Sequence, residues 1–195
     1  EEVFEEARAL GRGVLTFSNH TCLFDDPWLT SCITPPRWES IRWIAADALN
    51  FFGTPAKATL FNAGRCVPIV RGVGREQPGM AFLAERLQAG DHVHIFPEGG
   101  RSRELEGALQ TPFKKGMAQL VQESSPLLLP FIHVGMHEVL PIGARWPRFG
   151  QTVRVRFGEI TDSAETMADW SMEAITRWAE GQLRALSDAM VPSTF

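Results

Sequence analysis

The chain has 195 residues, of which 44% are hydrophobic and 22% charged, and its formal net charge is −4. This length and composition predict one globular domain over residues 1–195, with a sizeable core. The net negative charge argues against a nucleic-acid-binding protein, and against a membrane attachment that depends mainly on basic charge.

The cysteine content argues against a disulfide-rich or zinc-binding protein, and the hydropathy argues against a membrane-spanning segment. Three scattered cysteines are too few for a disulfide framework or a four-cysteine zinc site, and they favour a reducing compartment. No run of about 18 apolar residues predicts a membrane span. The chain starts at Glu1 rather than at a methionine, which leaves room for an N-terminal leader or anchor before it.

Apolar runs and breaker residues predict strands that alternate with helices. Short strands are expected at 14–17, 66–70, 92–96, 127–134 and 153–157, and helices at 1–10, directly after Pro27, and at 79–88, 113–122 and 163–190. Asp162 and Glu165 are expected to cap the last helix. This alternation indicates the α/β class, with a mixed, mostly parallel sheet flanked by helices.

Residues 17–27, FSNHTCLFDDP, combine a histidine and two carboxylates between an apolar strand and a proline. On a regular helix, His20 and Asp25 would lie about 140° apart around the axis. Asp26 is a favourable N-cap and Pro27 a favourable first helical residue, so a loop that feeds a helix is expected. In that loop Asp25 can accept the Nδ1 proton of His20, leaving Nε2 to remove a proton from a bound hydroxyl. The alternative is that the aspartates only cap a helix.

Three other segments carry residues that suit a phosphate group. After the strand at 92–96 come Glu98, Gly99 and Arg101, where glycine lets backbone N–H groups approach an anion and arginine can donate two hydrogen bonds to it. Arg71 follows the strand at 66–70, and Lys114 lies near a predicted helix start. Taken singly, each is equally compatible with an ordinary turn or a solvated side chain.

Two histidine pairs have a spacing that metal ligands also show. His92 and His94 lie on one face of a strand, and His133 and His137 are four residues apart. Gly135 and the preceding strand argue against a regular helix between the second pair. We therefore expect no metal site, and we interpret His92 and His94 as hydrogen-bonded strand residues, with a pocket-lining role as the alternative.

The order of these motifs resembles the glycerophospholipid acyltransferase superfamily over about residues 15–158. The matching elements are NH-x4-D, a strand ending in arginine, FPEG-x-RS, FK-x-G and an apolar strand that contains Pro130. The stretches GRCVPIVRG, GDHVHIFPEG, LPFIHVGMHEVLP and PRFGQ also resemble the tafazzin branch, whose members are phospholipid–lysophospholipid transacylases that remodel cardiolipin. Arg101 follows the wider superfamily, because tafazzin-like sequences often lack it.

The resemblance implies roles for the residues of these motifs. His20 would be the base that deprotonates the acceptor hydroxyl, and Asp25 would orient it. The glycerol phosphate would be held by Arg71, Glu98, Gly99 and Arg101, with help from Lys114. The expected enzyme needs no metal or other cofactor, and its partners are phospholipid and lysophospholipid substrates at a mitochondrial membrane, with no nucleic acid.

Two other functions remain open at this point. The first is an acyltransferase that uses acyl-CoA as donor and 1-acylglycerol 3-phosphate as acceptor. The second is a membrane lipid-binding protein without catalytic activity, which the intact His20, Asp25 and FPEG motifs disfavour. The acyl donor, the head-group and chain preference, and the oligomeric state do not follow from the sequence.

An aromatic segment separates the two halves of the predicted site and includes Trp38, Trp43, Phe51 and Phe52. These side chains are candidates for membrane contact, because tryptophan is frequent at bilayer interfaces. Packing in the protein core is the alternative. With a net negative charge, a peripheral or monotopic attachment would depend on apolar rather than basic side chains.

Overall fold

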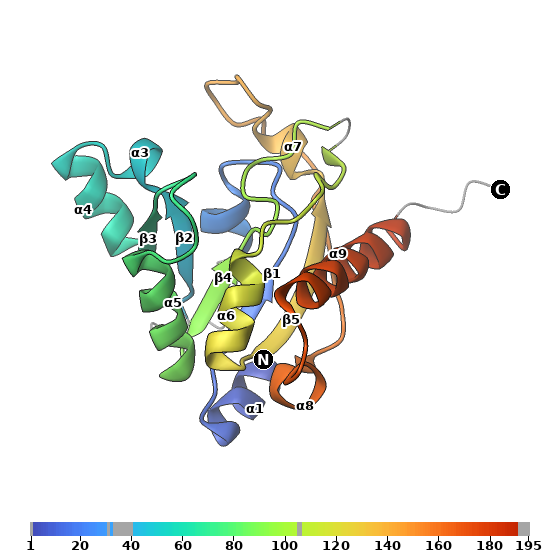
Figure 1. Ribbon diagram of the computed structural model, residues 1–195. Coiled ribbons are helices and arrows are strands. Elements are labelled where there is room, and N and C mark those ends of the chain that lie inside the picture. The colour runs from blue at the N-terminus through green and yellow to red at the C-terminus, as the bar shows by residue number, and fades with distance from the viewer. Residues whose placement is uncertain (1, 31, 33–40, 105–106, 191–195) are drawn as a thin grey trace.

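The structure is a computed structural model that describes residues 2–30, 32, 41–104 and 107–190, built around a seven-stranded sheet (Figure 1). The strands are β1 Val14–Phe17, β2 Trp43–Asp47, β3 Cys66–Ile69, β4 His92–Ile95, β5 Leu127–Val134, β6 Arg154–Phe157 and β7 Thr161–Asp162. The helices are α1 Glu2–Leu10, the π-helix η1 Asp25–Thr30, α3 Ala48–Phe51, α4 Pro55–Ala63, α5 Pro78–Gln88, α6 Gly116–Ser124, α7 Met136–Val139, α8 Ser163–Thr166 and α9 Met172–Asp188.

The sheet is mixed but mostly parallel, which confirms the predicted fold class. Its order is β3-β2-β4-β1-β5-β6, with β7 also paired to β5, and only β6 and β7 run antiparallel to their neighbour. All residues of β1 and β4 are buried, as expected for central strands covered on both faces. The carboxyl ends of these two adjacent strands therefore meet at one edge, the usual position of a ligand site in such sheets.

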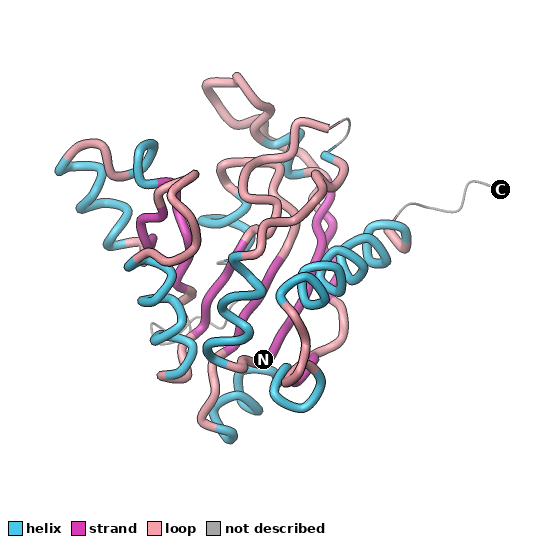
Figure 2. Tube along the Cα trace, in the orientation of Figure 1, coloured by secondary structure: helices cyan, strands magenta, loops and turns pink. Residues whose placement is uncertain are grey.

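Helices α5, α6 and α9 lie side by side over one face of the sheet (Figure 1). The main core lies between them and the strands, and includes Leu15, Leu83, Leu120 and Ile175. A smaller cluster on the other side packs Cys22 and Leu29 against Phe131. Figure 2 shows long loops gathered beyond the carboxyl ends of the parallel strands, so the buried layers support an end of the molecule built from loops.

The segment after His20 differs from the prediction in how its helix begins. Asp26 does not act as an N-cap: η1 already begins at Asp25, and the Asp26 carboxylate receives two hydrogen bonds from Arg42, one of them 2.6 Å long from Nε. Arg42 is only 7% exposed. A buried guanidinium requires a carboxylate partner, and this tertiary pairing replaces the expected local cap.

Two other predicted helices have different bounds in the structure. The segment 163–190 forms two helices, because Asp162 caps α8 and Ser171 caps α9 by accepting the Ala174 N–H. The helix predicted from 113 begins at Gly116, since the Phe113 and Lys114 N–H groups donate to Glu180 and Pro97 instead.

Candidate functional site

The residues predicted to carry chemistry follow different strands but meet at the carboxyl edge of the sheet. His20 lies three residues after β1, and Glu98 three residues after β4. Arg71 lies two residues after β3, and its Nε is 2.7 Å from Oδ2 of Asp47, the last residue of β2. The parallel topology thus gathers groups that are far apart in the sequence.

The His20–Asp25 contact predicted from the sequence is present. Nδ1 of His20 is 2.9 Å from Oδ2 of Asp25. The same oxygen accepts the backbone N–H groups of Thr21, at 2.5 Å, and Cys22, at 2.8 Å. These donors hold a carboxylate that is 1% exposed, so Asp25 fixes the imidazole with Nδ1 toward the protein.

The opposite edge of the His20 ring is available for chemistry. The ring stacks on Phe96, with centroids 4.0 Å apart and an interplanar angle of 11°. Nε2 makes no hydrogen bond with any residue that the structure describes, and the His20 side chain is partly exposed. A neutral imidazole held in this tautomer can take a proton on Nε2.

Glu98 holds the His20 loop through both of its carboxylate oxygens. Its Oε1 accepts the His20 N–H at 2.6 Å, and its Oε2 accepts the Gln110 N–H at 2.7 Å. The side chain is 3% exposed, and this burial raises the pKa of Glu98 to about 7. Both oxygens bind backbone N–H groups, so Glu98 positions the His20 loop, and its contact with the glycerol phosphate stays a prediction.

His133 in β5 is a site residue that the sequence did not identify as such. Its Nε2 is 3.0 Å from the Asn19 carbonyl oxygen and 3.6 Å from Oδ2 of Asp25. The Asn19 side chain in turn bonds the backbone N–H and C=O of His133, at 3.0 and 2.9 Å. A carbonyl only accepts, so the proton of His133 is on Nε2.

The Asn19–His20 peptide group is therefore held at both of its poles. Its carbonyl accepts from His133, and its N–H donates to Glu98. The His20 carbonyl also accepts the Ser102 N–H at 2.6 Å. Contacts from β5 and from the loop after β4 thus fix the backbone of His20, while Asp25 fixes its ring.

Cationic side chains surround the glycine turn that follows β4. Gly99 has a φ of +75°, and a Cβ there would lie 2.8 Å from the Lys114 side chain. A Cβ on Gly100 would lie 3.8 Å from Nη1 of Arg71. Arg101 follows the two glycines of this turn and makes no hydrogen bond or ion pair with any described residue. The positive charge around this turn, next to the His20 loop, suits a phosphate.

The strand histidines are hydrogen-bonded, as interpreted from the sequence. Oγ1 of Thr16 lies 2.8 Å from both Nε2 of His92 and Nδ1 of His94. Burial holds the pKa of His94 well below its ordinary value, so this side chain is neutral. Within the described residues, no three histidine, cysteine or carboxylate side chains come together as metal ligands.

The membrane-contact candidates have separate outcomes. Trp43 packs against the main core, as the alternative expected: its ring meets Phe82 edge-to-face, and its Nε1 donates to Asp91 at 3.1 Å. Phe51 and Phe52 are half-buried against Phe61 of α4 and stay predictions. Trp38 lies outside the described residues. No helix within the described ranges is long and apolar enough to cross a bilayer.

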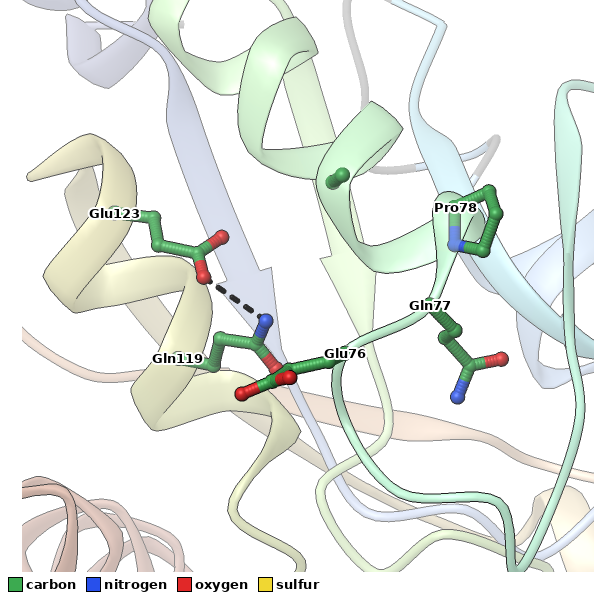
Figure 3. A pocket seen from close by; sticks show the side chains of 6 residues that line it. Glu76, Gln77, Pro78, Gln119 and Glu123 are labelled. Atoms are coloured by element: carbon green, nitrogen blue, oxygen red, sulfur yellow. Dashed lines mark hydrogen bonds between the residues drawn. The ribbon is translucent and has the colours of Figure 1, made fainter.

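A hollow of about 340 Å³ between α5 and α6 does not match this chemistry (Figure 3). Its lining includes the carboxylates of Glu76 and Glu123, and Gln119 donates to Glu123 at 2.9 Å. No basic side chain lines it. Two carboxylates would repel a phosphate, so the hollow is not a candidate for the lipid head group.

Fold and site together define an α/β protein with a histidine–carboxylate pair beside a glycine turn that has cationic side chains around it. Comparison with known proteins agrees with this class: a family model described as Acyltransferase matches residues 2–134. The chain therefore belongs to the acyltransferase family, as its motifs predicted.

Individual relatives narrow the comparison. The chain is 33% identical over 139 residues to a tafazzin from Drosophila melanogaster, covering 69% of this chain and 36% of the relative. It is 31% identical over 166 residues to a protein named Taffazin from Dictyostelium discoideum, covering 80% and 57%. An N-acylphosphatidylethanolamine synthase from Arabidopsis thaliana is 32% identical over 147 residues, covering 70% and 49%. The chain thus spans between 36% and 57% of the length of these relatives.

A solved structure supports the fold. The 1-acyl-sn-glycerophosphate acyltransferase PlsC from Thermotoga maritima superimposes with a TM-score of 0.61 at 21% identity. The match covers 92% of this chain and 67% of the other. At this identity the likeness establishes a shared architecture and leaves substrates to be argued from the site.

Proposed function

We propose that the protein transfers a fatty acyl group from a phospholipid to the hydroxyl of a lysophospholipid. The observation that carries this proposal is the His20–Asp25 pair, 2.9 Å apart, whose free Nε2 lies beside a turn surrounded by cationic side chains. Family membership and the similarity to two tafazzins support it.

His20 acts first as a base and then as an acid, so it carries no extra proton after the reaction. Nε2 removes the proton of the acceptor hydroxyl while that oxygen attacks the acyl carbonyl carbon of the donor. The new ester C–O bond forms, the donor ester C–O bond breaks, and the departing alkoxide takes the proton from Nε2. Asp25 stabilises the transient imidazolium through Nδ1.

The phosphate of the bound lipid is assigned to the turn after β4. Arg71, Arg101 and Lys114 supply positive charge around this turn, and Gly99 leaves room for the Lys114 side chain beside it. Such binding would hold the glycerol hydroxyl near Nε2, which lowers the barrier by orientation. Both lipids are membrane components, so we also propose peripheral association with a membrane.

The finer identity of the substrates rests on resemblance. The similarity to tafazzins supports cardiolipin remodelling at a mitochondrial membrane as the physiological role. Cell fractionation of the tagged full-length protein tests the location. A predominantly cytosolic or reticular distribution would contradict it.

An acyl-CoA-dependent acyltransferase is the second candidate, because Arg101 completes the FPEG-x-RS motif of the wider superfamily. The test measures transfer from labelled phosphatidylcholine to lysophospholipids, monolysocardiolipin included, without CoA. Phosphatidylethanolamine is added as an amine acceptor, because one relative is named an N-acylphosphatidylethanolamine synthase. Transfer without CoA supports the transacylase. Transfer only with acyl-CoA moves the protein to the second candidate, and no transfer from either donor contradicts both.

A further inference from the structure

We propose that residues 140–153, here called the rim loop, insert into the surface of an anionic phospholipid bilayer and turn the site toward it. This inference rests on the proposed lipid substrates and names the surface through which the protein reaches them. The rim loop joins α7 to β6 at the carboxyl end of β5, next to the candidate site (Figure 1).

The rim loop exposes large apolar side chains. Phe149 is 88% exposed and Trp146 80% exposed. Leu49, at 83%, and Val73, at 62%, are also among the five most exposed large hydrophobic side chains of the described residues. All four lie in segments that directly follow the carboxyl ends of β2, β3 or β5. Apolar exposure is thus concentrated at the site end, which marks an interaction surface.

The positive charge of the rim loop favours an anionic partner. Arg145 and Arg148 alternate with Trp146 and Phe149, and no acidic residue occurs between Glu138 and Glu159. The whole chain, in contrast, carries a net charge of −4. Aromatic side chains interleaved with arginine match the apolar boundary and the anionic head groups of a bilayer.

The backbone of the rim loop is anchored, so its side chains project from a fixed base. The Arg148 N–H donates to the Val139 carbonyl at 2.7 Å, and the Ala144 N–H donates to the Pro141 carbonyl at 2.9 Å. A Cβ on Gly135 would lie 2.2 Å from the Thr152 carbonyl oxygen, so the end of the rim loop packs directly on this turn. Little ordering is then needed when the surface meets lipid.

The first residue of the rim loop, Leu140, packs in one buried cluster with Cys22, two residues after His20. A Cβ on Gly107 would lie 2.9 Å from the Thr21 side chain and 3.4 Å from Nδ1 of His137 in α7. Thr21 is adjacent to His20 in the chain. Insertion of Trp146 and Phe149 would therefore bring the free edge of His20 toward the head-group region, where the acyl ester bonds lie.

The experiment measures vesicle binding without turnover, so its outcome is independent of the proposed reaction. Wild type and variants are sedimented with phosphatidylcholine vesicles, with and without phosphatidylglycerol. We expect the Trp146→Ser, Phe149→Ser double variant to bind both about tenfold more weakly. The Arg145→Gln, Arg148→Gln double variant should lose about thirtyfold only with phosphatidylglycerol and at low salt.

Matched changes at the far end of the sheet serve as controls. Leu10→Ser and Arg8→Gln alter an exposed apolar and an exposed basic side chain of α1, and binding should be unchanged. In a second measurement, brominated phospholipids should quench tryptophan fluorescence in wild type, and the quenching should fall in Trp146→Phe. Unchanged melting temperatures show that the variants are folded.

Three results would overturn the proposal. One is equal vesicle binding by the rim-loop and control variants. Another is quenching that persists unchanged in Trp146→Phe. The third is rim-loop variants that lose only self-association in analytical ultracentrifugation, because the surface would then bind a second copy of the chain rather than lipid.

Discussion

His133 supports the proposed base, His20, through the backbone, since its Nε2–H binds the carbonyl of the peptide that precedes His20. We predict that His133→Leu lowers kcat about tenfold to a hundredfold and leaves KM within about twofold, because His20 would lose its alignment. His133→Gln, which keeps an N–H donor at a similar reach, should recover most of kcat. Steady-state kinetics on both variants, with melting temperatures, provide the measurement.

The two variants separate positioning from simple packing. If Leu and Gln at this position reduced kcat equally and in proportion to their loss of stability, His133 would be a packing residue. Glu98, which binds the N–H of the same peptide group, leads to a prediction about pH, because its carboxylate titrates.

Glu98 should make stability depend on pH. Burial raises its pKa from 4.5 to about 7, so between these values the folded protein keeps a proton that the unfolded chain releases. The contribution of Glu98 to the unfolding free energy is therefore largest below the lower value and is lost as pH rises through about 7. Glu98→Gln removes this titration.

Urea unfolding of both proteins at about pH 5 and about pH 8 measures this effect. The unfolding free energy of wild type minus that of Glu98→Gln should be lower at the higher pH. Taking the difference cancels the other titrating groups. A difference that stays constant between the two values would show that Glu98 keeps an ordinary pKa.

At the level of elements, two glycines differ in the space around a new side chain: Gly13 is tightly packed, whereas Gly181 is open. A Cβ on Gly13, before β1, would lie 2.5 Å from the Leu87 carbonyl oxygen and 2.7 Å from that of Asp91. Gly13→Ala should therefore destabilise the protein by about 1–3 kcal/mol. Gly181 lies inside α9 with open space around its Cβ position. Gly181→Ala should stabilise by about 0.5–1 kcal/mol.

Thermal and chemical unfolding of the two alanine variants provide the comparison, and each is a control for the other because the chemical change is the same. A stable Gly13→Ala protein would mean that β1 and the end of α5 can separate at little cost. A destabilised Gly181→Ala protein would mean that α9 meets another surface at this position.

The sequence predicted elements well where they are encoded locally. The apolar runs of β1, β4 and β5 match the predicted strands to within one residue. β2 was not predicted, since its WIAAD sequence has no alternation of apolar and polar residues and lies in an aromatic segment. The end of α8 was also missed, because only the Ser171 cap and the next helix start mark it.

In the site, too, contacts between residues close in sequence were predicted and contacts between distant residues were not. The His20–Asp25 contact spans five residues, so the local loop signals sufficed. The contact of His20 with Glu98 spans 78 residues, and that of Asn19 with His133 spans 114. Their roles depend on which strands are neighbours in the sheet, and no local pattern encodes that order.

In the molecule as a whole, the candidate site and the rim loop lie at the same edge of the sheet. Helix α1 lies toward the amino ends of the parallel strands, whereas the His20 loop, the glycine turn after β4 and the rim loop lie at their carboxyl ends (Figure 1). A lipid surface that meets the rim loop would also face the site.

The central claim is that His20, oriented by Asp25, is the base for acyl transfer. The most direct measurement compares wild type and His20→Ala in transfer from labelled phosphatidylcholine to a lysophospholipid without CoA. We predict that His20→Ala loses at least about a hundredfold in rate, while its melting temperature and vesicle binding are retained. Full activity in a folded His20→Ala protein would contradict the account.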